Sequence, residues 1–115
     1  MITKGIRGAI TVNDNSVDAL KDATIILLNE MVQQNSLELS KISHVIFTTT
    51  KDINCAFPAK FARVDMGWSD VAMMCYHEMN VENALKMCLR VLIVYNCEDD
   101  FAPKFVYLRG AENLR

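Results

Sequence analysis

One apolar stripe constrains the fold of this chain more than any other feature. Between about Ser16 and Asn35, mostly apolar side chains recur at spacings of three and four, at Val17, Leu20, Thr24, Leu27, Leu28 and Met31. This spacing predicts a long amphipathic helix, capped near Asn15 or Ser16 where a polar turn signal ends. A helix with one apolar face has to cover another layer of structure, which the rest of the chain must supply.

Strand-type segments supply that layer. β-branched residues fill the run from Ser43 to Thr50, and Pro58 can open a short helix that ends near Gly67. The other predicted strands are Gly5–Val12, Val71–Tyr76, Leu89–Tyr95 and a short Lys104–Leu108. Strands interleaved with helices predict an α/β or α+β domain in which the long helix covers one sheet. No repeat, low-complexity segment or linker interrupts the chain, so we expect one domain over residues 1–115.

Composition and charge narrow the function. Hydrophobic residues make up 51% and charged residues 23% of the chain, as in a packed globular protein. The net charge of -2 gives no overall field for nucleic acid, so no nucleic-acid partner is expected. The N-terminus lacks a signal-peptide pattern, and no apolar run approaches the roughly 20 residues that span a bilayer. We therefore expect a cytoplasmic protein with no membrane contact, and a mean hydropathy of +0.12 suggests that some apolar surface lies in subunit contacts.

The most informative polar residues are four cations that have mostly apolar neighbours in the sequence. Arg90 lies in an otherwise apolar strand, where an unpaired charge would cost several kcal/mol, and Arg7 poses the same problem in the first strand. Lys60 and Arg63 lie one turn apart near the start of the Pro58 helix. Each has an ordinary alternative: a strand-end charge, a structural ion pair or a solvated helix face. Taken together, the four predict a site for a small polyanionic ligand.

Other chemistry has weaker support. Cys75 and His77 would lie about 7 Å apart along one strand face, too far for a thiol and its base. The run from His77 to Val81 fails the zinc pattern of two histidines four apart, and the four cysteines include no C-x-x-C pair. Neither a Gly-rich phosphate loop nor a G-x-S-x-G motif is present. We therefore expect no metal and no cofactor.

Several separated motifs resemble the monofunctional chorismate mutases of the small trimeric bacterial class. The matching segments, in the order and spacing of that family, are G-I-R-G-A-I-T-V (5–12), F-P-A-K-F-A-R (57–63), C-Y-H-E-M (75–79), C-L-R-V (88–91) and V-Y-L (106–108). The resemblance implies a mixed five-stranded sheet packed against a long helix. It also implies a homotrimer, built as a pseudo-α/β barrel with active sites between subunits. The implied reaction is the Claisen rearrangement of chorismate to prephenate, in the biosynthesis of phenylalanine and tyrosine.

The resemblance also implies residue roles. Arg90 would stabilise the negative charge that develops on the ether oxygen, and Glu78 and the Cys75 region would hold the ring hydroxyl and its developing positive side. The remaining positions that match substrate-binding residues of the family are Arg7, Phe57, Lys60, Arg63, Met74, Cys75, Tyr107 and Arg115. Of these, Arg7 and Tyr107 would bind a substrate carboxylate. The reaction needs no nucleophile, metal or proton carrier.

Strand alternation adds a prediction of its own. Cys75 and Glu78 are separated by an odd number of residues, so they would point to opposite faces of a regular strand. In a trimer, the two side chains of one chain would therefore serve two different sites.

Two alternatives remain open at the level of sequence. One is a non-catalytic homologue that binds a small dianionic metabolite, which would keep Arg7 and Arg63 but could dispense with Arg90. The other is an enamine or imine deaminase on a similar trimeric fold, although its motifs are not found in this chain.

Overall fold

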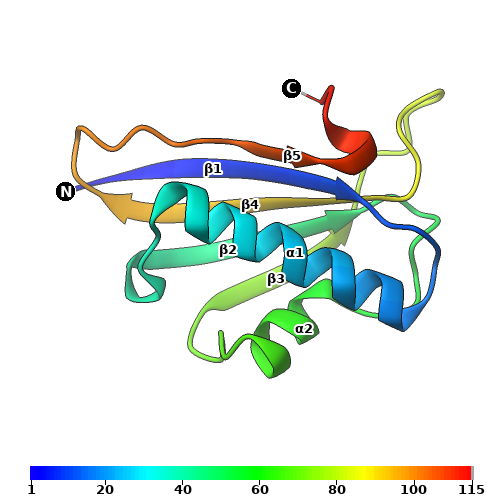
Figure 1. Ribbon diagram of the computed structural model, residues 1–115, viewed down its shortest axis with the longest axis horizontal. Coiled ribbons are helices and arrows are strands. Elements are labelled where there is room, and N and C mark those ends of the chain that lie inside the picture. Colours follow the sequence, from blue (N-terminus) through cyan, green and yellow to red (C-terminus); the bar gives the residue numbers. More distant parts are fainter. Residues whose placement is uncertain (115) are drawn as a thin grey trace.

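The computed structural model describes residues 1–114 as a five-stranded mixed sheet with two α-helices on one face (Figure 1). The elements are β1 (Ile2–Thr11), α1 (Val17–Asn35), the 3-10 turn η1 (Leu39–Lys41), β2 (Ile42–Thr49), α2 (Pro58–Asp65), β3 (Ala72–His77), β4 (Cys88–Cys97), β5 (Val106–Leu108) and the 3-10 turn η2 (Arg109–Ala111). The strand order is β3-β2-β4-β1-β5, with β4 antiparallel to both of its neighbours and the outer pairs parallel. The predicted mixed sheet and long helix are confirmed.

Helix α1 forms where the apolar stripe predicted it. The Ser16 hydroxyl accepts a hydrogen bond from the Ala19 N–H at 3.2 Å and so caps the first turn. Ser36 ends the helix in the left-handed conformation, and its N–H donates to the carbonyl oxygens of Gln33 and Val32. The buried side chains of α1 are Leu20, Ala23, Thr24, Leu27, Leu28, Met31 and Asn35. Val17 is exposed, so its predicted place in the stripe is wrong; it lies in the first turn, beyond the part that covers the sheet.

The strand ends differ from the prediction where pairing, and not local composition, decides them. β1 begins at Ile2 instead of Gly5, because Ile2 pairs with Cys97 and Lys4 with Tyr95 of β4. The Lys4 ammonium also donates to the carbonyl oxygens of Asp99 and Phe101, which fixes the turn after β4. The other boundaries lie within two residues of the predicted ones.

The sheet has one covered and one open face. Residues of β4 alternate between buried and partly buried, and the buried set (Leu89, Val91, Ile93 and Tyr95) packs into the main core under α1. α2 packs against α1 and β3, so both helices cover this same face (Figure 1). On the other face, no helix of the described chain covers the partly buried side chains of Ile46, Leu92 and Val94. The predicted candidate residues of β1 and β4 project from this open face.

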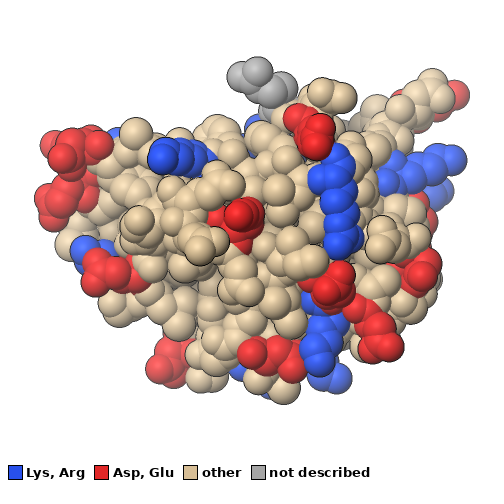
Figure 2. Space-filling view, in the orientation of Figure 1, with Lys and Arg blue, Asp and Glu red and all other residues tan. Residues whose placement is uncertain are grey.

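The helix side has an ordinary solvent-facing surface. Acidic and basic side chains are interspersed across it among neutral residues (Figure 2). Two ion pairs join its elements, Lys21 with Asp65 at 3.4 Å and Arg109 with Asp22 at 3.3 Å. Within residues 1–114, no helix combines the length and apolar character needed to cross a membrane.

Candidate functional site

Four of the predicted site residues come together on the open face of the sheet. In the β1–β4 ladder Arg7 pairs with Leu92 and Arg90 pairs with Ala9, so both arginines leave the same face. Tyr107 of β5 pairs with Ala9 in the parallel β1–β5 ladder, so its side chain leaves the same face. Three strands that are distant in sequence thus place two cations and a phenol side by side.

Arg7 and Tyr107 contact each other directly. The Arg7 guanidinium carbon lies 5.9 Å from the centre of the Tyr107 ring, within the range of a cation–π contact. The Tyr107 hydroxyl is buried and has no hydrogen-bond partner among the described residues. A buried hydroxyl without a partner costs free energy, so this group is suited to a ligand that brings an acceptor.

Arg90 and Glu78 form the most polar part of this face. Their side chains are 34% and 25% exposed, and the Arg90 Nε lies 3.7 Å from Glu78 Oε2. That separation is an ion pair but exceeds the length of a hydrogen bond. The Arg90 Nε is also buried without a partner among residues 1–114. The structural ion pair considered from sequence is therefore present, but it leaves one guanidinium donor unused.

Thr48, which the sequence did not single out, contacts the same carboxylate oxygen of Glu78 as Arg90 does. The Thr48 hydroxyl donates to Glu78 Oε2 at 2.5 Å. Thr48 lies opposite Arg90 in the β2–β4 ladder. In the sequence it is one of three consecutive threonines within a β-branched run, and only the register distinguishes it from Thr49 and Thr50.

Cys88 is a second residue that the sequence left without a role. It is fully buried on the Arg90 side of β4 and packs with Ala9 and Ala111. Burial raises the pKa of the Cys88 thiol, and the Arg90 guanidinium opposes this shift only in part. The thiol therefore stays neutral near pH 7.

The other predicted site residues form a second group at the β3 edge. They surround a cavity of about 390 Å³, whose lining includes Phe57, Lys60, Arg63, Met74 and Cys75. Phe57 precedes α2 and is 72% exposed, and Lys60 and Arg63 are also exposed. Cys75 points toward α2, where burial raises the pKa of its thiol and the Ala59 N–H partly offsets that effect.

Apart from Met74, which leaves the open face beside Ile46, the two groups lie on different sides of β3. Glu78 reaches Thr48 and Arg90 on the open face, whereas Cys75 lies against α2 on the covered face. The cavities that the two residues line are different ones. Within one chain the structure therefore does not bring the second group to Arg7 and Arg90. Arg115, the last predicted site residue, lies outside the described residues.

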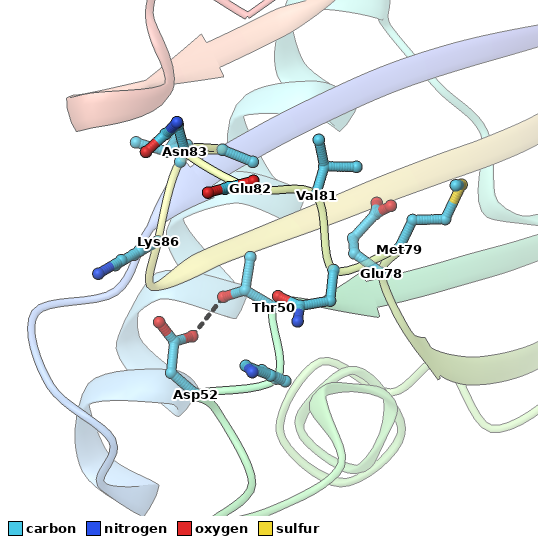
Figure 3. Close-up of a pocket in the computed structure, with 12 residues that line it drawn as sticks. Thr50, Asp52, Glu78, Met79, Val81, Glu82, Asn83 and Lys86 are labelled. Carbon is cyan, nitrogen blue, oxygen red and sulfur yellow. Dashed lines mark hydrogen bonds between the residues drawn. The ribbon is translucent and has the colours of Figure 1, made fainter.

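A cavity of about 450 Å³ lies beside Glu78, between the 50–52 turn and the loop that joins β3 to β4 (Figure 3). Asp52 ties these two segments together. Its carboxylate accepts hydrogen bonds from the Thr50 hydroxyl at 2.5 Å and from the Met87 N–H at 3.0 Å. Burial alone would raise the pKa of Asp52, but these hydrogen bonds outweigh it and hold the pKa below its ordinary value. The Glu78 N–H bonds to the Thr49 carbonyl at 2.8 Å, so the start of this loop is held in place.

The arrangement can bind and polarise a small anion. Two guanidinium groups, one phenol and one carboxylate face the same space, and within residues 1–114 no group of three or more His, Cys, Asp or Glu side chains is placed to hold a metal ion. The described part of this face carries no thiolate, and its imidazole, that of His44, lies beside Val94, four residues along β2 from the Thr48 that pairs with Arg90. Its chemistry is therefore fixed charge and hydrogen bonding.

Comparison with known proteins gives a consistent result. A family model described as chorismate mutase type I matches residues 3–115. The chain is 37% identical to a chorismate mutase of Thermus thermophilus over 116 aligned positions, which cover 99% of this chain and 94% of that protein. It is 33% identical to a chorismate mutase of Bacillus subtilis (strain 168), with 100% and 91% covered.

A solved structure agrees with these relatives. A chorismate mutase from Clostridium thermocellum superposes with a TM-score of 0.89 at 46% sequence identity, over 94% of this chain and 96% of that one. Sequence identity at this level over nearly the whole length, together with the match of the family model, shows more than a shared fold. The chain therefore belongs to the type I chorismate mutase family.

Proposed function

We propose that this chorismate mutase rearranges chorismate to prephenate in clefts between the subunits of a homotrimer. As a member of the type I family it is an isomerase of aromatic amino acid biosynthesis. One side of each cleft would be the open-face group: Arg7, Glu78, Arg90 and Tyr107. The other side would be the β3-edge group of the next subunit: Phe57, Lys60, Arg63, Met74 and Cys75.

One observation carries the assignment of the open face. Two buried donors there, the Arg90 Nε and the Tyr107 hydroxyl, have no acceptor within residues 1–114. Arg7 adds a second guanidinium beside the phenol. Chorismate carries two carboxylates and an ether oxygen, which are the acceptors that this set of donors lacks.

The chemistry of the rearrangement fits these groups. The ether C–O bond breaks ahead of C–C bond formation, so negative charge grows on the ether oxygen in the transition state. A guanidinium already fixed in place, that of Arg90, stabilises this charge without solvent reorganisation. Glu78 would hold the ring hydroxyl and face the side of the substrate that develops positive charge. All atoms stay within one molecule, so the proposed reaction uses no cofactor and no covalent intermediate.

Positioning supplies the rest of the rate enhancement. Chorismate has to be held in a compact conformer in which the two carbons that join are close together, as orientation requires in any intramolecular reaction. Arg7 and Tyr107 would hold one carboxylate, while Lys60 and Arg63 would line the entrance. Arg115 is proposed to add a cation at the entrance.

The cytoplasmic location expected from the sequence stays a prediction.

The open face supports the trimer. Its apolar side chains include Met74 at 59% and Tyr76 at 48% exposed, and across β2 the partly buried Ile46 and Leu92 continue the row that Met74 begins. A sheet face of this kind is stabilised when another layer covers it. A closed ring of three chains would cover all three faces with one repeated contact, and would set the β3-edge group of one chain against the open-face group of its neighbour.

Hybrid trimers test this division of the site. An Arg90→Ala chain has a damaged open-face group, and an Arg63→Ala chain has a damaged β3-edge group. Each variant alone should convert chorismate poorly. When the two are co-expressed, each mixed trimer contains one intact cleft, so random mixing should restore about a quarter of wild-type activity.

A matched pair serves as the control. Arg90→Ala and Arg7→Ala both damage the open-face group, so their co-expression should restore nothing. Recovery in this control, or none in the first pair, would contradict the intersubunit cleft. Wild-type protein that binds a dianionic analogue but leaves the diene absorbance of chorismate unchanged would instead favour the non-catalytic binding homologue.

A further inference from the structure

Thr48 has a position that links it to both proposed catalytic side chains. In the β2–β4 ladder it lies directly opposite Arg90, so the two side chains leave the same face of the sheet. Residues opposite each other in an antiparallel pair have Cβ atoms about 4.5–5.5 Å apart. Thr48 is therefore an immediate neighbour of the Arg90 side chain, and its hydroxyl donates to Glu78.

One carboxylate oxygen is shared between two donors at unequal distances. Glu78 Oε2 accepts the Thr48 hydroxyl at 2.5 Å and lies 3.7 Å from the Arg90 Nε. A hydrogen bond from Nε would need about 2.9 Å. The carboxylate therefore accepts a hydrogen bond from the neutral Thr48 hydroxyl and none from the charged Arg90 Nε.

This preference needs a cause, because both groups of the Glu78–Arg90 pair carry a charge, whereas in the bond from the Thr48 hydroxyl only the acceptor does. The Arg90 Nε is buried and has no hydrogen-bond partner among the described residues, and Glu78 Oε2 is a carboxylate oxygen close enough to satisfy it after a small shift. Without the Thr48 hydroxyl, closing the gap between Glu78 and Arg90 would satisfy both groups at once. The closed pair would occupy the donor that faces the developing charge on the substrate and would weaken its positive field.

We propose that Thr48 is a positioning residue for the rearrangement: its hydroxyl anchors Glu78 so that the Arg90 Nε stays free for the substrate. The inference rests on the proposed function, because it assumes that Arg90 stabilises the ether oxygen. Thr48 need not touch chorismate. It acts through Glu78 alone.

Removal of the hydroxyl tests the proposal. Thr48→Val keeps the β-branched shape, and its kcat for chorismate should fall at least tenfold, on the order of what a weakened oxyanion donor costs. KM should change less than about threefold, because the lost interaction forms mainly in the transition state. Thr48→Ser keeps the donor and should stay within about threefold of wild type. Thr49→Val removes the same atom from the next residue, whose hydroxyl points to the Ile53 carbonyl at 3.4 Å, and should leave kcat unchanged.

A double-mutant cycle separates positioning from a structural role. In a Glu78→Gln background the neutral amide competes weakly for the guanidinium, so adding Thr48→Val should change kcat less than about twofold. An equal loss in both backgrounds would overturn the proposal, as would a wild-type kcat in Thr48→Val. Should Thr48→Val not fold, Thr48→Ala in the same two backgrounds replaces it. Wild-type protein without turnover would overturn the proposed function and this inference with it, whereas active wild-type enzyme with unaffected Thr48→Val overturns this inference alone.

Discussion

The Sδ of Met31 occupies the space above Gly8, where any other residue would place its Cβ. A Cβ built on Gly8 overlaps this sulfur and lies 3.0 Å from the Met31 Cε and 3.2 Å from its Cγ. The contact joins the middle of β1 to the last turns of α1. Gly8 is thus required by the close approach of the helix to the sheet.

Gly8→Ala should therefore destabilise the protein. Overpacking of this kind costs about 1–3 kcal/mol, which a shift of the flexible Met31 side chain would reduce. Met31→Ala alone leaves a cavity and costs about 2–5 kcal/mol. Because the new methyl group would fill part of that cavity, the double variant should lose less than the sum of the two. Urea unfolding of the four proteins gives these free energies, and strictly additive losses would contradict the contact.

Tyr107→Phe should separate function from stability. The Tyr107 hydroxyl has no partner among residues 1–114, so its removal should leave the free energy of unfolding unchanged within about 0.5 kcal/mol. A hydrogen bond to a charged ligand is worth about 1.5–3 kcal/mol, so kcat/KM for chorismate should fall about 10- to 100-fold. Steady-state kinetics and thermal unfolding of the same samples check both parts.

Tyr95→Phe is the matched control, because its hydroxyl is satisfied and lies on the covered face. The Tyr95 hydroxyl accepts the Glu38 N–H at 2.9 Å. This variant should lose about 1 kcal/mol of stability and keep wild-type kcat/KM. The reverse outcome in the two tyrosine variants would show that the assignment of the two faces is wrong.

Asp52→Asn should destabilise the protein only where the wild-type carboxylate is charged. Since the folded-state pKa of Asp52 lies below that of the unfolded chain, its contribution is present above the unfolded pKa of about 3.9 and is lost as pH falls through the folded pKa. We expect Asp52→Asn to cost about 1 kcal/mol at pH 7 and progressively less below pH ~4.

Unfolding free energies of wild type and variant across pH 3–8 measure this difference. Asp70→Asn, the same substitution at an exposed carboxylate between α2 and β3, is the control and should leave the free energy of unfolding unchanged within about 0.5 kcal/mol at pH 7. A gap for Asp52→Asn that stays constant down to pH 3 would contradict the depressed pKa.

Local sequence information predicted the elements of the fold well, because their causes are local. Ser16 caps α1, the apolar stripe is buried from Leu20 onward, and Pro58 opens α2. The start of β1 and the end of β4 could not be predicted from local sequence, since Ile2 belongs to the sheet only through its pairing with Cys97. The buried amide of Asn35 shows the same limit: it bonds both backbone groups of Lys104, 69 residues away, to anchor the approach to β5.

The candidate site also contains residues that local sequence predicts and residues that only tertiary contacts reveal. Charges in apolar strands and the family motifs pointed to Arg7 and Arg90, and strand alternation placed Cys75 and Glu78 on opposite sides of β3, as the structure has them. Thr48 was not predictable, because its role depends on the register between β2 and β4 and on where the Glu78 side chain ends. Residue type identifies candidate charges, whereas the groups that orient them depend on tertiary contacts.

Arg90→Lys should reveal whether the guanidinium acts in the transition state. An ammonium keeps the charge but loses the Nε donor and the planar fork, so it cannot replace the buried group that lies 3.7 Å from Glu78. We expect kcat to fall about 10²- to 10³-fold and KM to rise far less. Arg109→Lys makes the same change at an exposed arginine paired with Asp22 and should keep wild-type kinetics. If Arg90→Lys instead raised KM with kcat unchanged, Arg90 would bind substrate and transition state equally, and the catalytic role would have to come from another group on the open face.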